Sequence, residues 1–466
     1  MPPEMYRTWA LGWVPVIVAM GLVSPENSEA PAPIEGGPLI IHAALSHTAY
    51  SRSLPDALTL KIDLAAAPNP ALPQRPPLNL ALVIDQSGSM AHEDKFMRAM
   101  MAARLIIENL SERDVVSVIA FNQKATVLSP AGAAVNREFL DHRLDEISPE
   151  GWTNLSAGLL EAFAQVNSLA TPGQVKRVIV LTDGQANRGV TDPRGLCRIA
   201  RMGRERGISL STMGCGKDFD EKVLIALAED GGGRYSYVRR PEEIAAAMAA
   251  ELNGLLTVVA QNVVVEVTVP EALQITSVPG WLMEEPVDGF RFDLGDVRQG
   301  EHTVLLLRLA PRNFLVGEVA TIEYRLTFDR TDLGVRQIEV AQVNAVALAE
   351  TDHALIRSSA DRGIVLYAGV TEAVEHAEEA ILGLDEEGFH HAVELFDQQY
   401  TSARRWAIDT RDQQLLNRTF MLNHFMTELT EASESGMLHG HADARQQLAK
   451  DVQYRRYLRR HHAHSD

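Results

Sequence analysis

The side chains best suited to chemistry in this sequence carry oxygen, and they gather in three short segments. Residues 85–89 read Asp-Gln-Ser-Gly-Ser and directly follow the apolar run 78–84. Residues 151–154 read Gly-Trp-Thr-Asn, and residues 182–184, Thr-Asp-Gly, follow the apolar run 178–181. Carboxylates and hydroxyls are ligands that Mg²⁺ prefers, whereas zinc would recruit His or Cys. The three segments together therefore predict a site for a hard divalent cation.

An α/β sheet would bring these segments together. From Leu78 to about Asn253, short apolar runs alternate with amphipathic segments. The runs expected to be buried strands are Leu78–Ile84, Val115–Phe121, Val178–Leu181 and Ile208–Met213. Such alternation predicts a doubly wound, mostly parallel sheet with helices between its strands. Ligands bind outside the carboxyl ends of the strands in open sheets of this kind, so the three segments should share one edge.

The candidate metal ligands at that edge are Asp85, Ser87, Ser89, Thr153 and Asp183. Hydroxyl groups are neutral. If the three hydroxyls contact the ion directly while both aspartates stand behind water, much of the ion's charge stays uncompensated. We then expect an incoming carboxylate to take the remaining coordination position.

In order and spacing, the three segments resemble the metal-ion-dependent adhesion site of von Willebrand factor type A (VWA) domains. The resemblance covers residues 78–253, and three stretches are similar to bacterial members of the family: Leu82 to Asp85, Thr182 to Gly189, and Gly231 to Gly233 followed by Tyr235.

The resemblance implies that Ser87, Ser89 and Thr153 coordinate directly, and that Asp85 and Asp183 act mainly through water or hydrogen bonds. It implies Mg²⁺, or Mn²⁺ or Ca²⁺, as the cofactor and a protein partner that supplies an acidic residue. Trp152 is a departure, because relatives often have glycine there; it would narrow the mouth of the site or add an apolar contact.

The rest of the chain predicts further domains. Beyond Leu256 the apolar period returns to two, which indicates a β-rich domain. The early strands are too few to bury a face alone, so they should join it. The expected organisation is a signal peptide or anchor (1–24), a linker (25–37), N-terminal strands that pair with the β-rich domain (38–76), a VWA domain (77–254), the β-rich domain (257–346) and a helical region (347–466). The VWA domain would thus be inserted in, or followed by, a β-sandwich-like domain.

The N-terminal segment favours export. Arg7 precedes an apolar run from Trp9 to Val23 that is short for a membrane span and typical of a secretory leader. We expect a periplasmic, envelope-associated or extracellular protein that contacts a membrane only through an uncleaved leader. An uncleaved anchor and a cytosolic start remain open alternatives.

The charge balance argues against nucleic acid as a partner. The 466 residues include 62 acidic and 43 basic side chains, giving a net charge of −19 that repels phosphate. The basic side chains cluster only at the C-terminus: Arg455, Arg456, Arg459, Arg460, His461, His462 and His464. We expect a frayed, solvated end there, with docking to acidic lipid headgroups or a partner as the alternative.

These observations favour an exported, divalent-cation-dependent protein-binding protein, an adhesin or scaffold, rather than an enzyme. No nucleophile–base set is evident, because Ser87 and Ser89 are assigned to the metal and no G-x-S-x-G or H-E-x-x-H motif occurs. Two alternatives stay open. One is a hydrolase that uses Mg²⁺ as a Lewis acid. The other, implied by the family resemblance, is an intracellular adaptor of an AAA+ ATPase.

Overall fold

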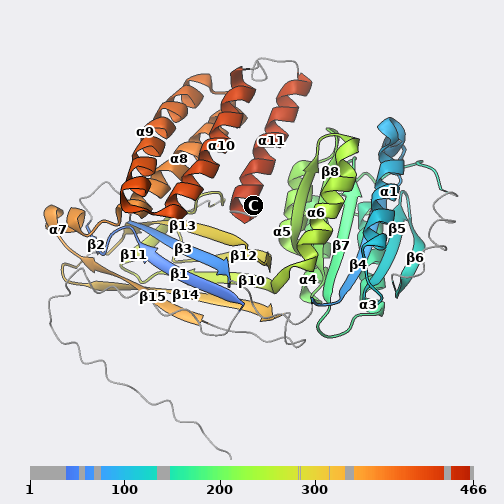
Figure 1. Cartoon of the computed structure of the whole chain (residues 1–466), viewed down its shortest axis with the longest axis horizontal. Helices are drawn as coiled ribbons and strands as arrows, with labels where there is room; N and C mark the ends of the chain where they lie inside the picture. Colours follow the sequence, from blue (N-terminus) through green and yellow to red (C-terminus); the bar gives the residue numbers. More distant parts are fainter. Residues whose placement is uncertain are drawn as a thin grey trace, which may run out of the picture.

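The computed structural model describes residues 38–51, 58–67, 75–133, 147–281, 283, 285–313, 315–330, 341–434 and 442–461. It contains an α/β domain, a pair of β-sheets and a group of C-terminal helices (Figure 1). The expected leader and linker, residues 1–37, lie outside the described residues.

The α/β domain is built on a six-stranded sheet of order β6-β5-β4-β7-β8-β9. Its strands are β4 (Leu78–Asp85), β5 (Val115–Phe121), β6 (Ala125–Ala133), β7 (Val175–Thr182), β8 (Ser209–Cys215) and β9 (Gly232–Val238). All neighbours are parallel except β5 and β6. Strand β6 lies at the edge, where Pro130 can be accommodated because an edge strand need not donate every backbone hydrogen bond.

Helices cover both faces of this sheet. Helices α1 (Lys95–Glu108) and α6 (Ile244–Leu256) share a core with Leu80, Leu82 and Ile84 of β4. Ala81 and Val83 point the other way, toward a second core with α3 (Leu155–Ser168), α4 (Pro193–Glu205) and α5 (Glu221–Gly231). Every residue of β4 is buried, as expected for a parallel strand covered on both faces. The predicted doubly wound fold is confirmed.

Two further sheets pack around one hydrophobic core, and each takes strands from both sides of the α/β domain in the sequence. Their orders are β1-β3-β13-β11 and β12-β10-β14-β15-β2. The strands are β1 (Leu39–Leu45), β2 (Ala49–Tyr50), β3 (Leu58–Ala66), β10 (Val258–Thr268), β11 (Leu273–Ser277), β12 (Gly289–Arg298), β13 (His302–Pro311), β14 (Val319–Arg330) and β15 (Ala341–Ala349). Strand β3 pairs antiparallel with β13, from Leu58 opposite Leu309 to Ala65 opposite His302.

The α/β domain is joined to this sandwich through buried ion pairs. A guanidinium nitrogen of Arg177 on β7 lies 2.5 Å from a carboxylate oxygen of Asp296 on β12, and both side chains are almost fully buried. Arg298 on β12 pairs with Glu251 on α6 at 2.8 Å. Because a buried charge is costly without its partner, these pairs favour one relative position of the two domains.

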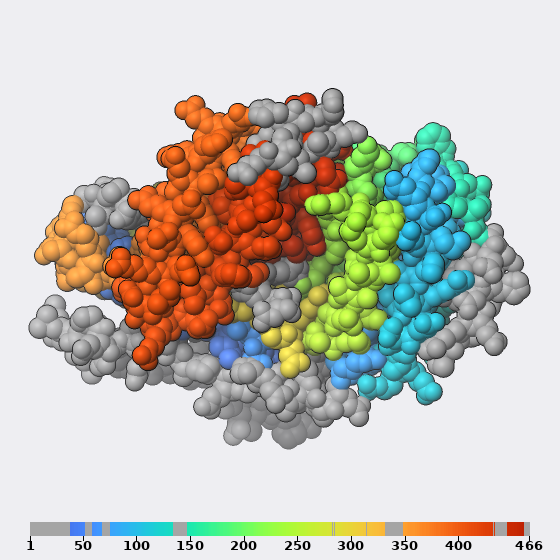
Figure 2. Space-filling model, turned by 45° about the horizontal axis from the view of Figure 1, so that its top comes forward, coloured from blue at the N-terminus to red at the C-terminus, as the bar shows by residue number. Residues whose placement is uncertain are grey.

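The C-terminal region consists of α7 (His353–Ser358), α8 (Arg362–Gly383), α9 (Glu386–Thr410), α10 (Gln413–Glu434) and α11 (Ala442–His461). Helix α11 lies between the other helices and the α/β domain (Figures 1 and 2). Its Leu448 and Val452 belong to the core of the helical bundle, whereas Tyr457 belongs to the core of the α/β domain. No helix in the described part of the chain has the length and apolar character needed to cross a bilayer.

The expectation of a frayed, solvated C-terminal basic cluster is wrong for the arginines. Arg456 and Arg459 both pair with Glu378 of α8, Arg455 with Glu428 of α10, and Arg460 with Glu229 of α5. The positive charges therefore meet carboxylates on three neighbouring helices, a tertiary arrangement that the local sequence does not encode. His462 and His464 lie outside the described residues.

Candidate functional site

The three oxygen-rich segments meet at the carboxyl edge of the α/β sheet. The first two are joined by backbone hydrogen bonds, Gly88 N–H to the Gly151 carbonyl (3.2 Å) and Glu150 N–H to the Gln86 carbonyl (2.8 Å). The loop after β7 is tied to the second segment, since Asn187 N–H donates to the Thr153 carbonyl at 3.0 Å. The structure thus brings all five predicted ligands into one neighbourhood.

Asp85, the last residue of β4, is fully buried and held by two donors. Ser87 N–H donates to its Oδ1 at 2.8 Å, and Thr182 Oγ1 donates to its Oδ2 at 2.5 Å. Burial raises the pKa of Asp85 to about 6, although these hydrogen bonds oppose the rise. A cation nearby would favour the ionised form, so the carboxyl is well placed to support a metal through water.

Asp183 is also buried, and its two oxygens have different partners. Ser89 Oγ donates to Oδ1 at 2.6 Å, and Lys95 Nζ lies 2.9 Å from Oδ2. The Ser87 and Ser89 hydroxyl oxygens are 3.1 Å apart. Burial would lower the pKa of Lys95, but its hydrogen bond with Asp183 and the attraction of that carboxylate outweigh the effect and raise it.

Thr153 completes the group. A methyl group built on Gly184 would lie 3.4 Å from Thr153 Oγ1 and 3.7 Å from Ser89 Oγ, so both hydroxyls border the same space beside this glycine. The Thr153 amide donates to Asn187 Oδ1 at 2.9 Å, and the next residue, Asn154, caps α3 by accepting from Ala157 N–H. These bonds fix the backbone that carries the Thr153 hydroxyl.

The donor set fits a hard divalent cation. It consists of two carboxylates and three hydroxyls, with no His or Cys ligand among them. Each carboxylate oxygen already accepts a hydrogen bond from a protein donor. That arrangement leaves the hydroxyls of Ser87, Ser89 and Thr153 as the candidates for direct contact. Across the described residues, no cluster of three or more His, Cys, Asp or Glu side chains is placed to hold a metal.

The rim of the site has an exposed aromatic side chain. Trp152 is 50% exposed, and the Arg188 guanidinium carbon lies 4.4 Å from the centre of its ring. Arg188 N–H also donates to the Thr153 carbonyl at 3.2 Å. A cation–aromatic pair therefore stands beside the predicted ligand Thr153 and remains open to solvent.

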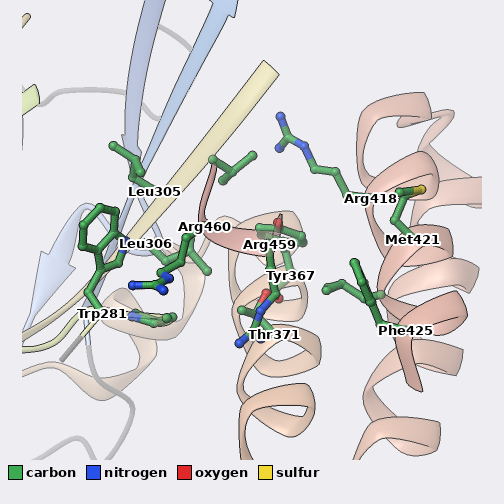
Figure 3. A pocket seen from close by; sticks show the side chains of 14 residues that line it. Trp281, Leu305, Leu306, Tyr367, Thr371, Arg418, Met421, Phe425, Arg459 and Arg460 are labelled. Carbon is green, nitrogen blue, oxygen red and sulfur yellow. The ribbon is translucent and has the colours of Figure 1, made fainter. Parts of the chain in front are cut away.

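A separate pocket lies between the sandwich and the C-terminal helices (Figure 3). Trp281, Tyr367 and Arg418 are among its lining residues, yet its volume is only about 50 Å³. Its arginines already have carboxylate partners, for example Asp63 for Arg418. The pocket thus offers little room and no uncommitted charge to a ligand.

Sequence reasoning missed one buried member of the metal-site cluster, Lys95, and left Thr182 without a role. Lys95 occurs one turn before the buried Ala99 on α1, so helical spacing places it on the core face. A lysine on the core face of a helix, soon after an acidic motif, could have indicated a buried partner for an acidic residue of the site.

The comparisons with known proteins identify the α/β domain. Residues 79–250 match the model of the von Willebrand factor type A domain, so this part of the chain is a VWA domain. Domains of this family generally mediate protein–protein interaction and typically bind a divalent metal at the adhesion site.

Similar curated proteins include YfbK of Escherichia coli (strain K12), an uncharacterised protein, which is 28% identical over 270 residues, 57% of this chain and 46% of YfbK. Human inter-alpha-trypsin inhibitor heavy chain H4 is 32% identical over 165 residues, 34% of this chain and 18% of H4. The match to YfbK thus spans about half of that relative's length.

Among solved structures, a von Willebrand factor type A protein from Catenulispora acidiphila is similar with a TM-score of 0.63 and 15% identity, over 94% of this chain and 99% of that one. The ArnB paralog VWA2 from Sulfolobus acidocaldarius has a TM-score of 0.55 and 16% identity, over 89% and 98% of the two chains. At these identities the likeness concerns the fold, and it extends well beyond the VWA domain.

Proposed function

We propose that this chain is an exported, non-enzymatic protein that binds another protein through a divalent cation, Mg²⁺ or Mn²⁺, held at the VWA adhesion site. Ser87, Ser89 and Thr153 contact the ion directly, and Asp85 and Asp183 support it through water or hydrogen bonds. A carboxylate from the partner protein completes the coordination. The protein acts as an adhesin or scaffold in the periplasm, at the envelope or outside the cell.

One observation carries the proposal: the hydroxyls of Ser87, Ser89 and Thr153 lie together at the carboxyl edge of the sheet, while both aspartates are already held by protein donors. Neutral ligands leave a divalent ion with uncompensated charge, and an anionic group from outside compensates it. Ser89 is only partly buried, so such a group can approach.

The same geometry supports a binding role over catalysis. The Ser89 hydroxyl donates to Asp183, and the second oxygen of that carboxylate is held by Lys95. Asp183 is thus committed to an ion pair and to holding the Ser89 hydroxyl, which is a positioning role rather than that of a free general base.

The test is a pull-down from an envelope extract of the source cells with the full chain as bait. We expect a partner that is retained with Mg²⁺ or Mn²⁺, lost with chelator, and lost with Thr153→Ala bait. Thr427→Ala, on the exposed side of α10, is the matched control and should retain the partner. Retention of the same partner in chelator and by the Thr153→Ala bait would mean that recognition lies elsewhere.

Trp152 permits a finer test, because a large exposed aromatic side chain beside the metal can anchor an interface. Trp152→Gly should weaken partner binding and leave the Mn²⁺ affinity of the free protein within about twofold, since the indole is not a ligand. Equal loss of both affinities would instead assign Trp152 a structural role in the loop. Isothermal titration with Mn²⁺ and the pull-down separate these results.

A further inference from the structure

Lys95 is the one buried ammonium in the cluster of metal-site residues, and its position is enclosed. The residue is only 7% exposed, and lysine is rarely buried unless it is paired. Its Nζ lies 2.9 Å from Asp183 Oδ2. A methyl group built on Gly216, which has a φ of +78°, would lie 3.6 Å from Nζ, so the loop after β8 covers the ammonium closely at this glycine.

We propose that Lys95 determines the ligand specificity of the metal site. Its fixed positive charge lowers the affinity for the cation, and it leaves the ion-bound site with a positive charge that an anionic group of the partner compensates. This inference rests on the proposed function, because it assumes that the site binds a divalent ion. It assigns a role to a residue that supplies no ligand atom.

The net charge of the site depends on its buried carboxylates and on the ammonium of Lys95. Two carboxylates and one ammonium give the protein side chains of the site a net charge of −1, because the three hydroxyls are neutral. A divalent ion reverses this to a single positive charge. Without the ammonium, the same ion would be neutralised by Asp85 and Asp183 alone. An incoming carboxylate would then be attracted to the ion-bound site much less strongly. Glu93 also attracts Lys95, but Glu93 is exposed and its charge is screened by water.

Lys95 also positions Asp183. By occupying Oδ2, it leaves only Oδ1 directed at Ser89 and the hydroxyl cluster. Asp183 is thereby kept from chelating the ion with both oxygens, which favours the neutral hydroxyls as direct ligands. Position and charge thus act in the same direction, toward a loosely held ion that accepts an outside anion.

A purely structural lysine and a charge-setting lysine predict opposite effects on metal affinity. Lys95→Gln retains a hydrogen-bond donor but removes the charge. We expect it to bind Mn²⁺ about tenfold more tightly than the wild type, because the Coulomb repulsion between the ammonium and the ion, over several ångströms in a wet site, is removed. Lys95→Arg, which keeps the charge, should stay within about threefold of the wild type. A structural lysine would instead lower the affinity in both variants.

Asp183→Asn provides a second test, which can be used even if Lys95→Gln alone folds poorly. Alone, Asp183→Asn removes a negative charge and should weaken Mn²⁺ binding. Adding Lys95→Gln restores the original net charge through a neutral amide pair, so the double variant should bind Mn²⁺ more tightly than Asp183→Asn. Such a rescue would show that Lys95 and Asp183 are energetically coupled, and a double-mutant cycle measures this coupling.

The experiment is isothermal titration of the full-length variants with MnCl₂, in buffers of equal ionic strength that contain either chloride or acetate as a carboxylate probe. Acetate should tighten Mn²⁺ binding to the wild type and have a smaller effect on Lys95→Gln. Unchanged or weaker binding by Lys95→Gln, together with no rescue in the double variant, overturns the role of Lys95 while leaving the metal site intact. A wild type that binds no Mn²⁺ overturns the proposed function as well.

Discussion

At the scale of single residues, the site depends on side chains that hold the candidate ligands as much as on the ligands themselves. Thr182 is the clearest case, since its hydroxyl donates to Asp85 Oδ2 at 2.5 Å and accepts from Gly184 N–H at 3.2 Å. It therefore fixes both a buried carboxylate and the glycine that borders the hydroxyl cluster. Groups that orient ligands in this way commonly matter 10- to 100-fold in metal affinity.

We accordingly expect Thr182→Val, which keeps the side-chain shape but removes the hydroxyl, to weaken Mn²⁺ binding by about 10- to 100-fold. Isothermal titration measures the effect, and Thr427→Val on α10 is the control. An unchanged affinity in folded Thr182→Val would show that Asp85 needs no hydroxyl donor to support the ion.

The sequence was informative about the candidate ligands and much less so about the residues behind them. Asp85, Ser87, Ser89, Thr153 and Asp183 belong to short motifs whose spacing is visible in one dimension. Lys95, the first residue of α1, meets Asp183, which directly follows β7, across a separation of 88 residues. Contacts of that kind depend on how elements pack, and local pattern does not contain them.

At the scale of elements, Asp114 joins the start of β4 to the turn between α1 and β5. Its carboxylate accepts from Leu78 N–H (2.8 Å), Ser111 N–H (2.7 Å) and two guanidinium nitrogens of Arg75 (2.9 and 2.6 Å). Burial opposes the charge of Asp114, but these bonds prevail and lower its pKa to about 2. The network positions the strand that ends in Asp85.

Because the folded-state pKa of Asp114 lies below its value of 3.8 in the unfolded chain, its contribution is complete above pH 4 and is lost as the pH falls toward 2. Asp114→Asn should therefore reduce the free energy of unfolding by about 2 kcal/mol or more at pH 5, and the deficit should shrink as the pH falls. Urea unfolding of both proteins between pH 2 and 5 measures it. A deficit that does not vary with pH would contradict the assignment.

Strands with strong apolar character were predicted well, and weaker ones were not. Val115–Phe121 was found with its observed bounds, because both of its faces are buried. Strand β9 begins with two glycines and was not identified as a strand, since glycine has a low strand propensity and β9 gains its stability from pairing with β8.

At the scale of the whole molecule, α11 connects the helical bundle to the VWA domain. Tyr235 N–H on β9 donates to the Tyr457 hydroxyl at 2.9 Å, and Lys450 donates to the Phe219 carbonyl at 2.9 Å. Lys450 Nζ also lies 3.5 Å from the centre of the Phe219 ring. These contacts attach the C-terminal helix to the last strand of the VWA sheet and to the loop before α5.

Tyr457→Phe should therefore destabilise the protein by about 1–3 kcal/mol, because the buried amide of Tyr235 loses its acceptor. Thermal unfolding reports the loss, and faster hydrogen exchange at the Tyr235 amide locates it. Tyr400→Phe, on the partly exposed side of α9, is the control. Unchanged exchange at Tyr235 would show that α11 does not hold β9 in solution.

The helical character of the C-terminal region was predictable from its spacing, but the placement of α11 was not. Tyr457 and the arginines of α11 meet partners on β9, α5, α8 and α10. Those partners are distant in sequence. The local sequence of basic side chains therefore led to the prediction of a solvated C-terminal end.

The central claim is that a divalent cation sits among the hydroxyls of Ser87, Ser89 and Thr153. Anomalous diffraction from crystals of the full chain soaked in MnCl₂ tests it most directly. We predict one strong manganese peak within about 2.3 Å of all three hydroxyl oxygens, with Asp85 and Asp183 behind water, and no peak there in Thr153→Ala crystals. Crystals without a peak at this edge, or with manganese bound by other residues, would contradict the account.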